Sequence, residues 1–460
     1  MQVAAAKPIE RTEQRPRSKL AGKIRNVSVK RDPLKLTAYT AVLLTLGFSA
    51  WLNGEANAHY AGDDRLAQAW IMGLSVPVLV FLMGRIAQLC RERRAIRLSH
   101  AAGIVGVVLL FLSVHHCSTS IQVMTGAPWY LSKPGRLEVV ERELMVPPPG
   151  KVRIRVEACG VCRSDALTVE GLAADIRYPR VPGHEVVGRI DALGEGVSAW
   201  TPGQRVGVGF LGGYCGRCTP CRRGDLVNCQ NQPVSGVTAD GGYAEVMIAD
   251  EHALAAVPAE LAPADAAPLL CAGVTTYNAL RNSPARPGDL VAVLGIGGLG
   301  HLAVQFANRM GFRVAAIARG DEMQPLARQL GAHHYIDSQD GDPAAALQAL
   351  GGASVILATV PSGKAMSALI GGLRARGRMI VVGVSPDPIE VDTAQLIFGT
   401  RAIEGSLTGS PLDSEDTLAF SALEGIRPRI ETVPLEAAAE AYGKMMRSEA
   451  RFRMVLVTGQ

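Results

Sequence analysis

Cysteine is scarce in this sequence, and its placement excludes a fold stapled by disulfides. The 460 residues contain nine cysteines, which are too few to cross-link a chain of this length. Six of the nine fall between Cys159 and Cys229, a distribution typical of metal sites. We therefore expect a reducing compartment.

Internal repeats and low-complexity segments are also absent, and the length allows two or three ordinary domains. The formal net charge is +5, but the positive excess lies mostly in residues 1–35 and in Arg91–Arg97. The excess of positive charge is therefore a property of the N-terminal region and not of the rest of the chain. We expect no nucleic-acid partner.

Residues 1–35 predict a basic, disordered tail. They contain few large apolar side chains and cannot bury enough surface to fold alone. The tail is too long and too basic before its first apolar run to be an ordinary secretory signal. Its cations are Lys7, Arg11, Arg15, Arg17, Lys19, Lys23, Arg25, Lys30, Arg31 and Lys35.

Residues 36–126 predict a membrane region with two or three transmembrane helices. The apolar stretches are Leu36–Leu52, Ala69–Leu89 and Ala101–Val114, and the first two approach the roughly 20 residues that span a bilayer. Buried helices of a soluble domain are the alternative, which is disfavoured because the stretches are apolar all round. The basic tail and Arg91–Arg97 belong on the cytoplasmic side. The linker Asn53–Gln68 between the first two spans would then lie on the opposite side of the membrane.

A third full span would place everything after Val114 outside the cytoplasm, away from the reducing conditions that the cysteines indicate. Either Ala101–Val114 is re-entrant or interfacial, or the two parts are a fusion whose membrane half lost a later span. The segments Phe48–Asn53 and Leu112–Cys117 weakly resemble small multi-span membrane proteins of mobile elements. We expect membrane localisation with the remainder on the cytoplasmic side, or a soluble cytoplasmic product if the native protein lacks the N-terminal region.

From about Ala127 the composition predicts an irregular β domain followed by an α/β domain. Val/Ile-rich segments punctuated by Gly and Pro predict strands at Val152–Val156, Glu185–Ile190 and Arg205–Val208. After Cys271, apolar strands alternate with helices, which indicates βαβ units and a parallel sheet. These segments are Leu290–Leu294, Leu299–Arg309, Arg313–Ala318, Asp321–Leu330, Ser354–Ala358, Lys364–Leu373 and Arg378–Val382.

Four cysteines within fifteen residues predict a structural zinc site. Closely spaced thiolates reduce the loop entropy of assembling a tetrahedral shell, and four cysteines leave no position for a substrate. Two local disulfides are the less favoured alternative. The ligands would be Cys215, Cys218, Cys221 and Cys229.

Two further segments predict a catalytic metal. The sequence from Gly160 to Asp165 supplies the thiolate of Cys162, and Gly183-His184-Glu185 supplies an imidazole beside a carboxylate. A catalytic zinc needs such donors and one open position. From about residue 128 to the C-terminus, the chain resembles the zinc-containing alcohol dehydrogenases of the medium-chain dehydrogenase/reductase superfamily.

That resemblance implies a GroES-like zinc catalytic domain at 127–271 and 409–460 and a Rossmann dinucleotide-binding domain at 272–408. It implies an α/β fold with a doubly wound parallel sheet, preceded here by the expected transmembrane helices. The segment Leu269–Tyr277 matches the family segment with the third catalytic ligand, which would be Cys271. Cys159 matches no family ligand, and we interpret it as a small core residue.

The resemblance also implies roles around the metal. Glu185 matches a carboxylate that lies near the zinc and can ligate it transiently, and Asp165 matches the one that orients the histidine ligand. Ser164 matches the hydroxyl that touches the substrate oxygen and starts a proton relay. Two positions depart from the family: Arg163 replaces a frequent histidine, and Leu167 replaces the histidine that ends the relay in several members.

A glycine-rich turn predicts the coenzyme site. Gly295, Gly297, Gly298, Leu299 and Gly300 follow an apolar strand and open a helix, the context in which G-x-G-x-x-G binds a dinucleotide pyrophosphate.

The second strand of this domain ends without the acidic residue that favours NAD. Arg319 stands there instead, which favours NADP, although Asp321 and Glu322 follow closely. By resemblance, Thr275, Val382 and Val384 lie near the nicotinamide, and Arg453 lies near the pyrophosphate.

The resemblance implies a zinc-dependent, NAD(P)-linked alcohol dehydrogenase or aldehyde reductase. We expect two zinc ions per chain, a small alcohol or aldehyde substrate, and a homodimer or homotetramer. One alternative is a membrane component with the dehydrogenase anchored to it or carried as a passenger. Another is a zinc-free quinone reductase of the same superfamily.

Overall fold

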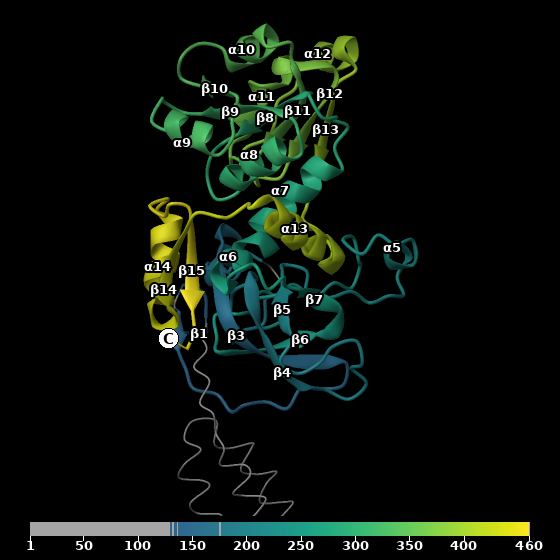
Figure 1. The fold of residues 1–460 in the computed structure, drawn as a ribbon, viewed down its shortest axis with the longest axis vertical. Helices are drawn as coiled ribbons and strands as arrows, with labels where there is room; N and C mark the ends of the chain where they lie inside the picture. Colours follow the sequence, from purple (N-terminus) through teal and green to yellow (C-terminus); the bar gives the residue numbers. More distant parts are fainter. Residues whose placement is uncertain (1–128, 131–132, 136, 174–175, 460) are drawn as a thin grey trace, which may run out of the picture. The chain divides into compact units, whose positions relative to one another are not determined.

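The computed structural model describes residues 129–130, 133–135, 137–173 and 176–459 (Figure 1). All of them belong to Gln122–Gln460, the second of two units into which the chain divides. The expected tail and the apolar stretches of residues 36–126 lie outside the described residues. Within the described part, no helix combines the length and the apolarity that crossing a bilayer requires.

A seven-stranded sheet forms the first half of the described chain and receives its last strands from the C-terminus. The order is β14-β15-β3-β4-β5-β7, with β6 paired to β3. The expected strands are confirmed, although β3 continues five residues beyond Val156. The bounds are β3 Lys151–Val161, β4 Val186–Leu193, β5 Arg205–Val208, β6 Val246–Asp250, β7 Leu254–Ala256, β14 Ile430–Pro434 and β15 Arg453–Val457.

The C-terminal strand returns to the start of this sheet. β15 pairs antiparallel with the end of β3, with Met454 opposite Val161. Side chains of both strands, including Ile154, Val156 and Leu456, are buried in one apolar cluster. This pairing brings Arg453 beside the end of β3, where Cys162 follows.

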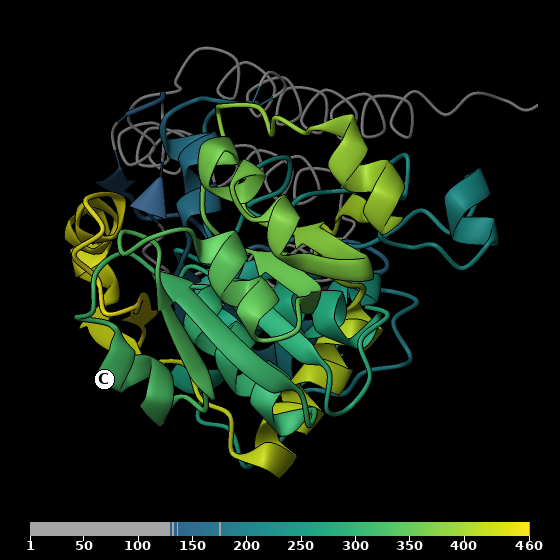
Figure 2. The same ribbon diagram turned by 90° about the horizontal axis from the view of Figure 1, so that it is seen from above.

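A six-stranded parallel sheet forms the other half, in the order β10-β9-β8-β11-β12-β13. Alternate residues of β8 enter two different cores: Val291 and Val293 pack in one, and Leu290 and Ala292 in the other. Helices therefore cover both faces, as Figure 2 shows, which confirms the doubly wound sheet. Its strands are β8 Leu290–Leu294, β9 Arg313–Ala318, β10 His334–Asp337, β11 Ala353–Ala358, β12 Leu373–Val381 and β13 Ala402–Gly405.

Two expected helices are shorter than the sequence indicates. Asp321–Leu330 was expected to be helical, but α9 spans Gln324–Gln329. Residues Lys364–Leu373 were expected to be helical throughout, but α11 ends at Ser367 and Leu373 already begins β12. Two poor helix formers, Gly371 and Gly372, follow, and Gly372 packs so closely that a Cβ atom there would lie 2.8 Å from Leu347. The chain there adopts a short 3-10 turn at Ile370–Gly372.

Helices and short elements complete the structure. The longer helices are α7 Ala272–Arg281, α8 Gly300–Arg309, α13 Pro411–Glu424 and α14 Ala438–Met446. The shorter ones are α4 Ala166–Val169, α5 Thr219–Arg222, α6 Pro263–Ala266, α9 Gln324–Gln329, α10 Pro343–Ala349, α11 Gly363–Ser367 and α12 Thr393–Gly399. The 3-10 turns are η1 Arg163–Asp165, η2 Glu251–Ala253, η3 Ala267–Leu270, η4 Ile370–Gly372 and η5 Leu435–Ala437, and the short strands are β1 Trp129–Tyr130 and β2 Glu138–Val139.

Candidate metal centre and coenzyme site

Four side chains from three separate segments meet in a buried cluster, which we call the inner cluster. One potential ligand atom from each of Cys162, His184, Glu185 and Cys271 lies within 4.8 Å of those of the others. Cys162 follows β3, His184 and Glu185 precede β4, and Cys271 lies between η3 and α7. The fold therefore brings together all four residues expected at the catalytic metal.

Two glycines allow this close assembly. Gly183 has φ +101°, and a Cβ atom there would lie 2.5 Å from the Tyr243 ring. A Cβ atom on Gly160 would collide with the carboxylate of Glu185. Glycine at both positions thus lets the two ligand-bearing loops approach each other.

Asp165 orients the histidine. Its Oδ1 lies 2.8 Å from His184 Nδ1, while its Oδ2 accepts hydrogen bonds from the Cys162 backbone N–H at 2.9 Å and from the Tyr243 hydroxyl at 2.8 Å. The other ring nitrogen, His184 Nε2, is buried and has no hydrogen-bond partner among the described residues. A buried donor atom left open in this way is what a metal ligand requires.

The sulfur atoms of the inner cluster are prepared for a cation. Cys162 Sγ and Cys271 Sγ lie 3.8 Å apart. A hydrogen bond from Cys271, aided by the charges of Arg453 and His184, holds the pKa of Cys162 well below its usual range despite burial. Burial disfavours the charged imidazole, but Asp165 and Cys162 outweigh it and raise the pKa of His184 to about 10. A thiolate beside an imidazolium fits zinc, because a bound zinc ion would replace the proton on His184 Nε2 and supply the positive charge in its place.

Arg453 connects the inner cluster to the glycine-rich turn. Its guanidinium forms a buried ion pair with Glu185 Oε1, and Glu185 Oε2 has no partner among the described residues. A Cβ atom on Gly298 would lie 3.0 Å from Arg453 Nη1. Arg453 therefore lies next to the turn at which we expect the pyrophosphate.

Other side chains border the inner cluster. Ser164 follows Cys162 in η1 and is half-buried, whereas Arg163 is exposed. Phe210 packs edge-on against the His184 ring, with centroids 5.2 Å apart. Sequence reasoning missed Phe210 because no local motif marks it.

The four cysteines of the run from Cys215 to Cys229 form a second set, which we call the outer cluster. Potential ligand atoms of Cys215, Cys218, Cys221 and Cys229 also lie within 4.8 Å of one another. All are free thiols, so the structure contains none of the local disulfides considered as the alternative. Hydrogen bonds from the backbone N–H of Arg217 and from other amides lower the pKa of Cys215 to about 5. Figure 1 shows α5, which carries Cys221, on an extension away from both sheets.

The glycine-rich turn connects β8 to α8 as expected. Gly295 has φ +92°, and a Cβ atom there would lie 2.5 Å from Val360. A Cβ atom on Gly300 would collide with the Gly295 carbonyl. The helix begins at Gly300, so its free N–H groups face the end of β8.

The end of β9 carries the residues that bear on coenzyme choice. Arg319 is exposed, and its side chain makes no hydrogen bond or ion pair with the described residues. Asp337, at the end of β10, accepts hydrogen bonds from the backbone N–H groups of Gly320 and Gln339, both at 2.8 Å. Sequence reasoning missed Asp337, which lies on a neighbouring strand.

The three residues expected near the nicotinamide have different environments. Thr275 is buried in α7, one turn after Cys271. Val382 is half-buried after β12, while Val384 is 91% exposed.

Comparisons with known proteins find relatives that match both halves of the described chain. Residues 148–259 match the family model of the alcohol dehydrogenase GroES-like domain, and residues 298–423 match that of the zinc-binding dehydrogenases. An alcohol dehydrogenase, patD, of Penicillium expansum is 43% identical over 320 residues, which are 70% of this chain and 94% of that protein. An alcohol dehydrogenase of Geobacillus stearothermophilus is 36% identical over 70% of this chain and 95% of its own length.

Solved structures show the same architecture. A cinnamyl alcohol dehydrogenase from Sorghum bicolor aligns with a TM-score of 0.66 and 31% identity over 72% of this chain and 97% of that one. A structure from Helicobacter pylori titled as CAD complexed with NADP(H) aligns with a TM-score of 0.64 and 27% identity, covering 73% of this chain and 98% of that one.

Proposed function

This chain belongs to the zinc-type alcohol dehydrogenases of the medium-chain dehydrogenase/reductase superfamily, and we propose that Cys162, His184 and Cys271 hold its catalytic zinc. The reaction is the interconversion of an alcohol and a carbonyl compound with NAD(P)(H). The observation that carries the assignment is the buried, unpartnered Nε2 of His184 beside two sulfur atoms. Bound zinc supplies a Lewis acid for the substrate oxygen, while the nicotinamide supplies hydride chemistry.

Each neighbouring side chain has a separate task in this proposal. Asp165 holds the His184 ring through Nδ1, so that Nε2 faces the ligands. Ser164 exchanges the substrate proton at its hydroxyl. Glu185 offers Oε2 as a transient ligand while Arg453 holds its other oxygen. Because Leu167 stands in place of a terminal histidine, the proton would leave through the ribose hydroxyls of a bound coenzyme and water, or by another route.

The outer cluster holds a second zinc ion that performs no chemistry. Four thiols form a complete tetrahedral shell and leave no open position.

Activity and metal content test the assignment together. The full-length protein is assayed with a panel of alcohols and aldehydes, and its zinc is measured by mass spectrometry. We expect two zinc ions per chain and activity that a chelator removes. Full activity with less than one zinc per chain would favour the zinc-free quinone reductase instead.

We propose that NADP is preferred over NAD. The exposed and unpartnered Arg319 is available to a 2′-phosphate, whereas the nearest strand-end carboxylate, Asp337, is engaged by two backbone N–H groups. Replacing Arg319→Gln should lower kcat/KM for NADPH by roughly tenfold or more, the usual weight of a charge-assisted hydrogen bond, and leave NADH unaffected. Arg286→Gln, an exposed arginine elsewhere in the same half, is the matched control. Equal effects on both coenzymes would contradict this preference.

We propose a homodimer or homotetramer. Among the described residues, the edge strand β13 pairs on one side only, with β12, and Ile397 and Phe398 of the preceding α12 are 71% and 89% exposed. Light scattering on the purified chain tests this, and a monomer at micromolar concentration would contradict it.

We propose membrane attachment only for residues 36–126, on hydropathy alone, with the catalytic part on the cytoplasmic side. Cell fractionation tests it. Activity in the soluble fraction, in a product that starts near residue 127, would exclude it.

A further inference from the structure

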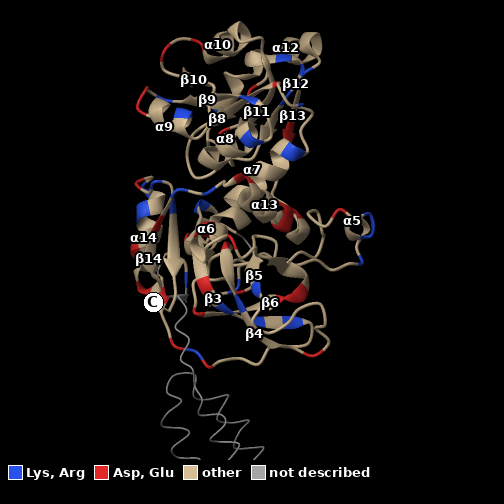
Figure 3. Ribbon diagram, in the orientation of Figure 1, with Lys and Arg blue, Asp and Glu red and all other residues tan. Residues whose placement is uncertain are grey.

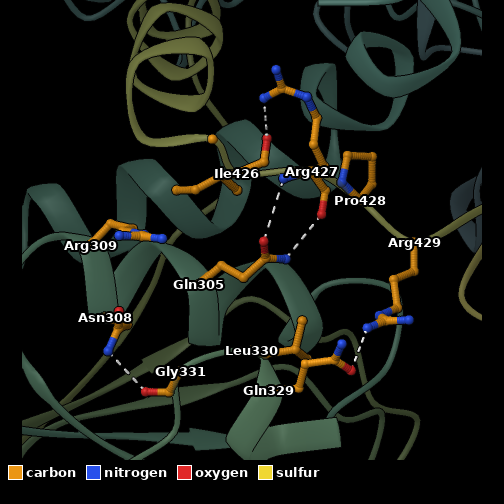
Figure 4. Close-up of a pocket in the computed structure, with 11 residues that line it drawn as sticks. Gln305, Asn308, Arg309, Gln329, Leu330, Gly331, Ile426, Arg427, Pro428 and Arg429 are labelled. Carbon is orange, nitrogen blue, oxygen red and sulfur yellow. Dashed lines mark hydrogen bonds between the residues drawn. The ribbon is translucent and has the colours of Figure 1, made fainter.

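A pocket of about 370 Å³ lies apart from both metal clusters (Figure 4). It is formed where α8 and α9 end and where the segment Gly425–Arg429 leads from α13 to β14. None of its lining residues belongs to a metal cluster or to the Gly295–Gly300 turn. Its volume is near the lower end of the range for small-molecule sites.

The lining of this pocket is positive. It includes Arg309, Arg427 and Arg429 and no carboxylate. Three helices end here, and each contributes roughly −0.5 charge at its C-terminus, less for the short α9. The guanidinium groups of Arg309 and Arg429 alone exceed that negative contribution, so the pocket attracts anions.

The three guanidinium groups are engaged to different degrees. Arg427 donates to the carbonyl oxygens of Ser421 and Ile426 at 2.9 and 2.8 Å, and Figure 4 shows its guanidinium turned away from the pocket. Arg429 donates from one nitrogen to Gln329 Oε1 at 2.7 Å. Arg309 is exposed and makes no side-chain hydrogen bond or ion pair with the described residues. Arg309 and Arg429 therefore retain free donors.

The wall between these two arginines is fixed in place. Gln305 Nε2 donates to the Arg427 carbonyl at 3.1 Å, and Gln305 Oε1 accepts from the Arg427 backbone N–H at 3.4 Å. Asn308 donates to the Gly331 carbonyl at 3.0 Å. The pocket is thus formed without a ligand and needs little reorganisation to bind one.

We propose that this pocket binds a small phosphate monoester through Arg309 and Arg429, and that its occupancy strengthens coenzyme binding. A forked guanidinium group matches the oxygen atoms of a phosphate dianion, and the second arginine adds positive charge on the other side of the pocket. The volume accommodates an ester with a small organic group in addition to the phosphate.

The link to the coenzyme is the backbone of Arg429. Its N–H donates to His301 Nε2 at 3.1 Å, and its carbonyl accepts from the N–H groups of Phe452 and Arg453 at 3.0 and 3.1 Å. His301 Nδ1 in turn contacts the Gly297 carbonyl at 2.9 Å in the coenzyme turn. A ligand that orders the Arg429 side chain therefore also orders contacts to both sides of that turn, and coupling between the two sites is reciprocal.

Calorimetry on the full-length, zinc-loaded protein tests binding, with ribose 5-phosphate as the probe and ribose and inorganic phosphate as separate arms. Ribose 5-phosphate should bind, and ribose should not. Arg309→Gln, which breaks no contact in the described structure, should weaken binding by roughly tenfold, and Arg309→Gln with Arg429→Gln by more. Arg286→Gln controls for general charge, and Arg319→Gln controls for phosphate binding at the coenzyme site.

Coenzyme titrations by nucleotide fluorescence test the coupling. Saturating ribose 5-phosphate should lower the Kd of the coenzyme by about fivefold, the lower end of typical couplings, in the unsubstituted protein and in Arg286→Gln but not in the double variant. No binding at millimolar ribose 5-phosphate, unchanged binding in the double variant, or loss of binding in Arg319→Gln would overturn the site. Binding without a change in coenzyme Kd would overturn the coupling. Alcohol dehydrogenase activity is measured separately, so failure here leaves the proposed reaction intact.

Discussion

The two candidate metal sites of this chain, the outer and the inner cluster, contain similar residue types but are assembled in different ways. The outer cluster takes four cysteines from one run, Cys215 to Cys229, on an extension beside the sheets. The inner cluster takes Cys162, His184 and Cys271 from three segments, of which the first and the last are more than a hundred residues apart in the sequence. The side chains of Cys162 and His184 are buried, at 4% and 1% exposure.

Their hydrogen bonds differ as well. Nearby backbone N–H groups stabilise the thiolates of Cys215 and Cys218 and lower their pKa values, whereas burial raises the pKa of Cys221 to about 12. The inner ligands depend on side chains from distant elements, including Asp165, Tyr243 and Arg453, and leave buried atoms without partners among the described residues. A complete shell of four ligands suits a structural ion. Buried polar atoms without a partner, in a preorganised site, suit a catalytic ion that keeps a position open.

The largest effect should follow from removing one inner ligand. Cys162→Ala should lower activity by about a thousandfold and zinc from two ions per chain to one, since a Lewis acid contributes several kcal/mol to the transition state. Kinetics and zinc content are measured together. Cys159→Ala is the matched control, because Cys159 is an equally buried thiol outside the cluster. An inactive Cys162→Ala that still holds two zinc ions would refute the ligand assignment.

A smaller effect should follow from loosening an inner ligand. Asp165→Asn removes the charge that orients His184, and we expect roughly a 10- to 100-fold loss of zinc affinity or activity. Zinc affinity is measured by competition with a chelator. If added zinc does not restore part of the activity, Asp165 acts on something other than metal retention.

The outer cluster should tolerate substitution better. Cys218→Ser should release one zinc ion and expose the α5 region to protease, while activity at low temperature falls less than tenfold, because no inner ligand depends on that run. Limited proteolysis and kinetics at several temperatures measure the two consequences. A thousandfold loss in a folded protein would mean that the two clusters are not independent.

The stability of the protein in acid should depend on His301, which lies outside both clusters. Burial, reinforced by the Arg429 charge, lowers the pKa of His301 to about 4 from its unfolded value near 6.5. Neutral His301 therefore stabilises the fold fully above about pH 6.5, and that contribution, on the order of 3 kcal/mol, is lost as the pH falls toward 4. Substitution of His301 should change the kinetics at neutral pH less than any of the substitutions above.

Denaturant unfolding from pH 8 to pH 4.5 checks this prediction. His301→Gln keeps an acceptor for the Arg429 N–H but cannot titrate, so its stability should fall less steeply with acid. Equal slopes in both proteins would assign the acid sensitivity to the metal clusters instead.

Local sequence patterns were sufficient where the structure is local. The outer cysteines, the Gly295–Gly300 turn and the alternating strands and helices could all be predicted, because neighbouring residues form each feature. Cys162 and His184 were also predictable from their short motifs. Cys271 was predictable only through family resemblance, since no local spacing relates it to the other ligands.

Other features depend on contacts across the fold. Helix α11 ends at Ser367, and the chain beyond it packs closely against Leu347 at Gly372. Phe210 reaches His184 only after the loops fold together. The basic pocket combines the ends of three helices with the Gly425–Arg429 segment. The sequence by itself therefore determined which residues can bind metal and pyrophosphate. Only the tertiary structure decided which of them share a buried site, because burial and close approach depend on segments far apart in the chain.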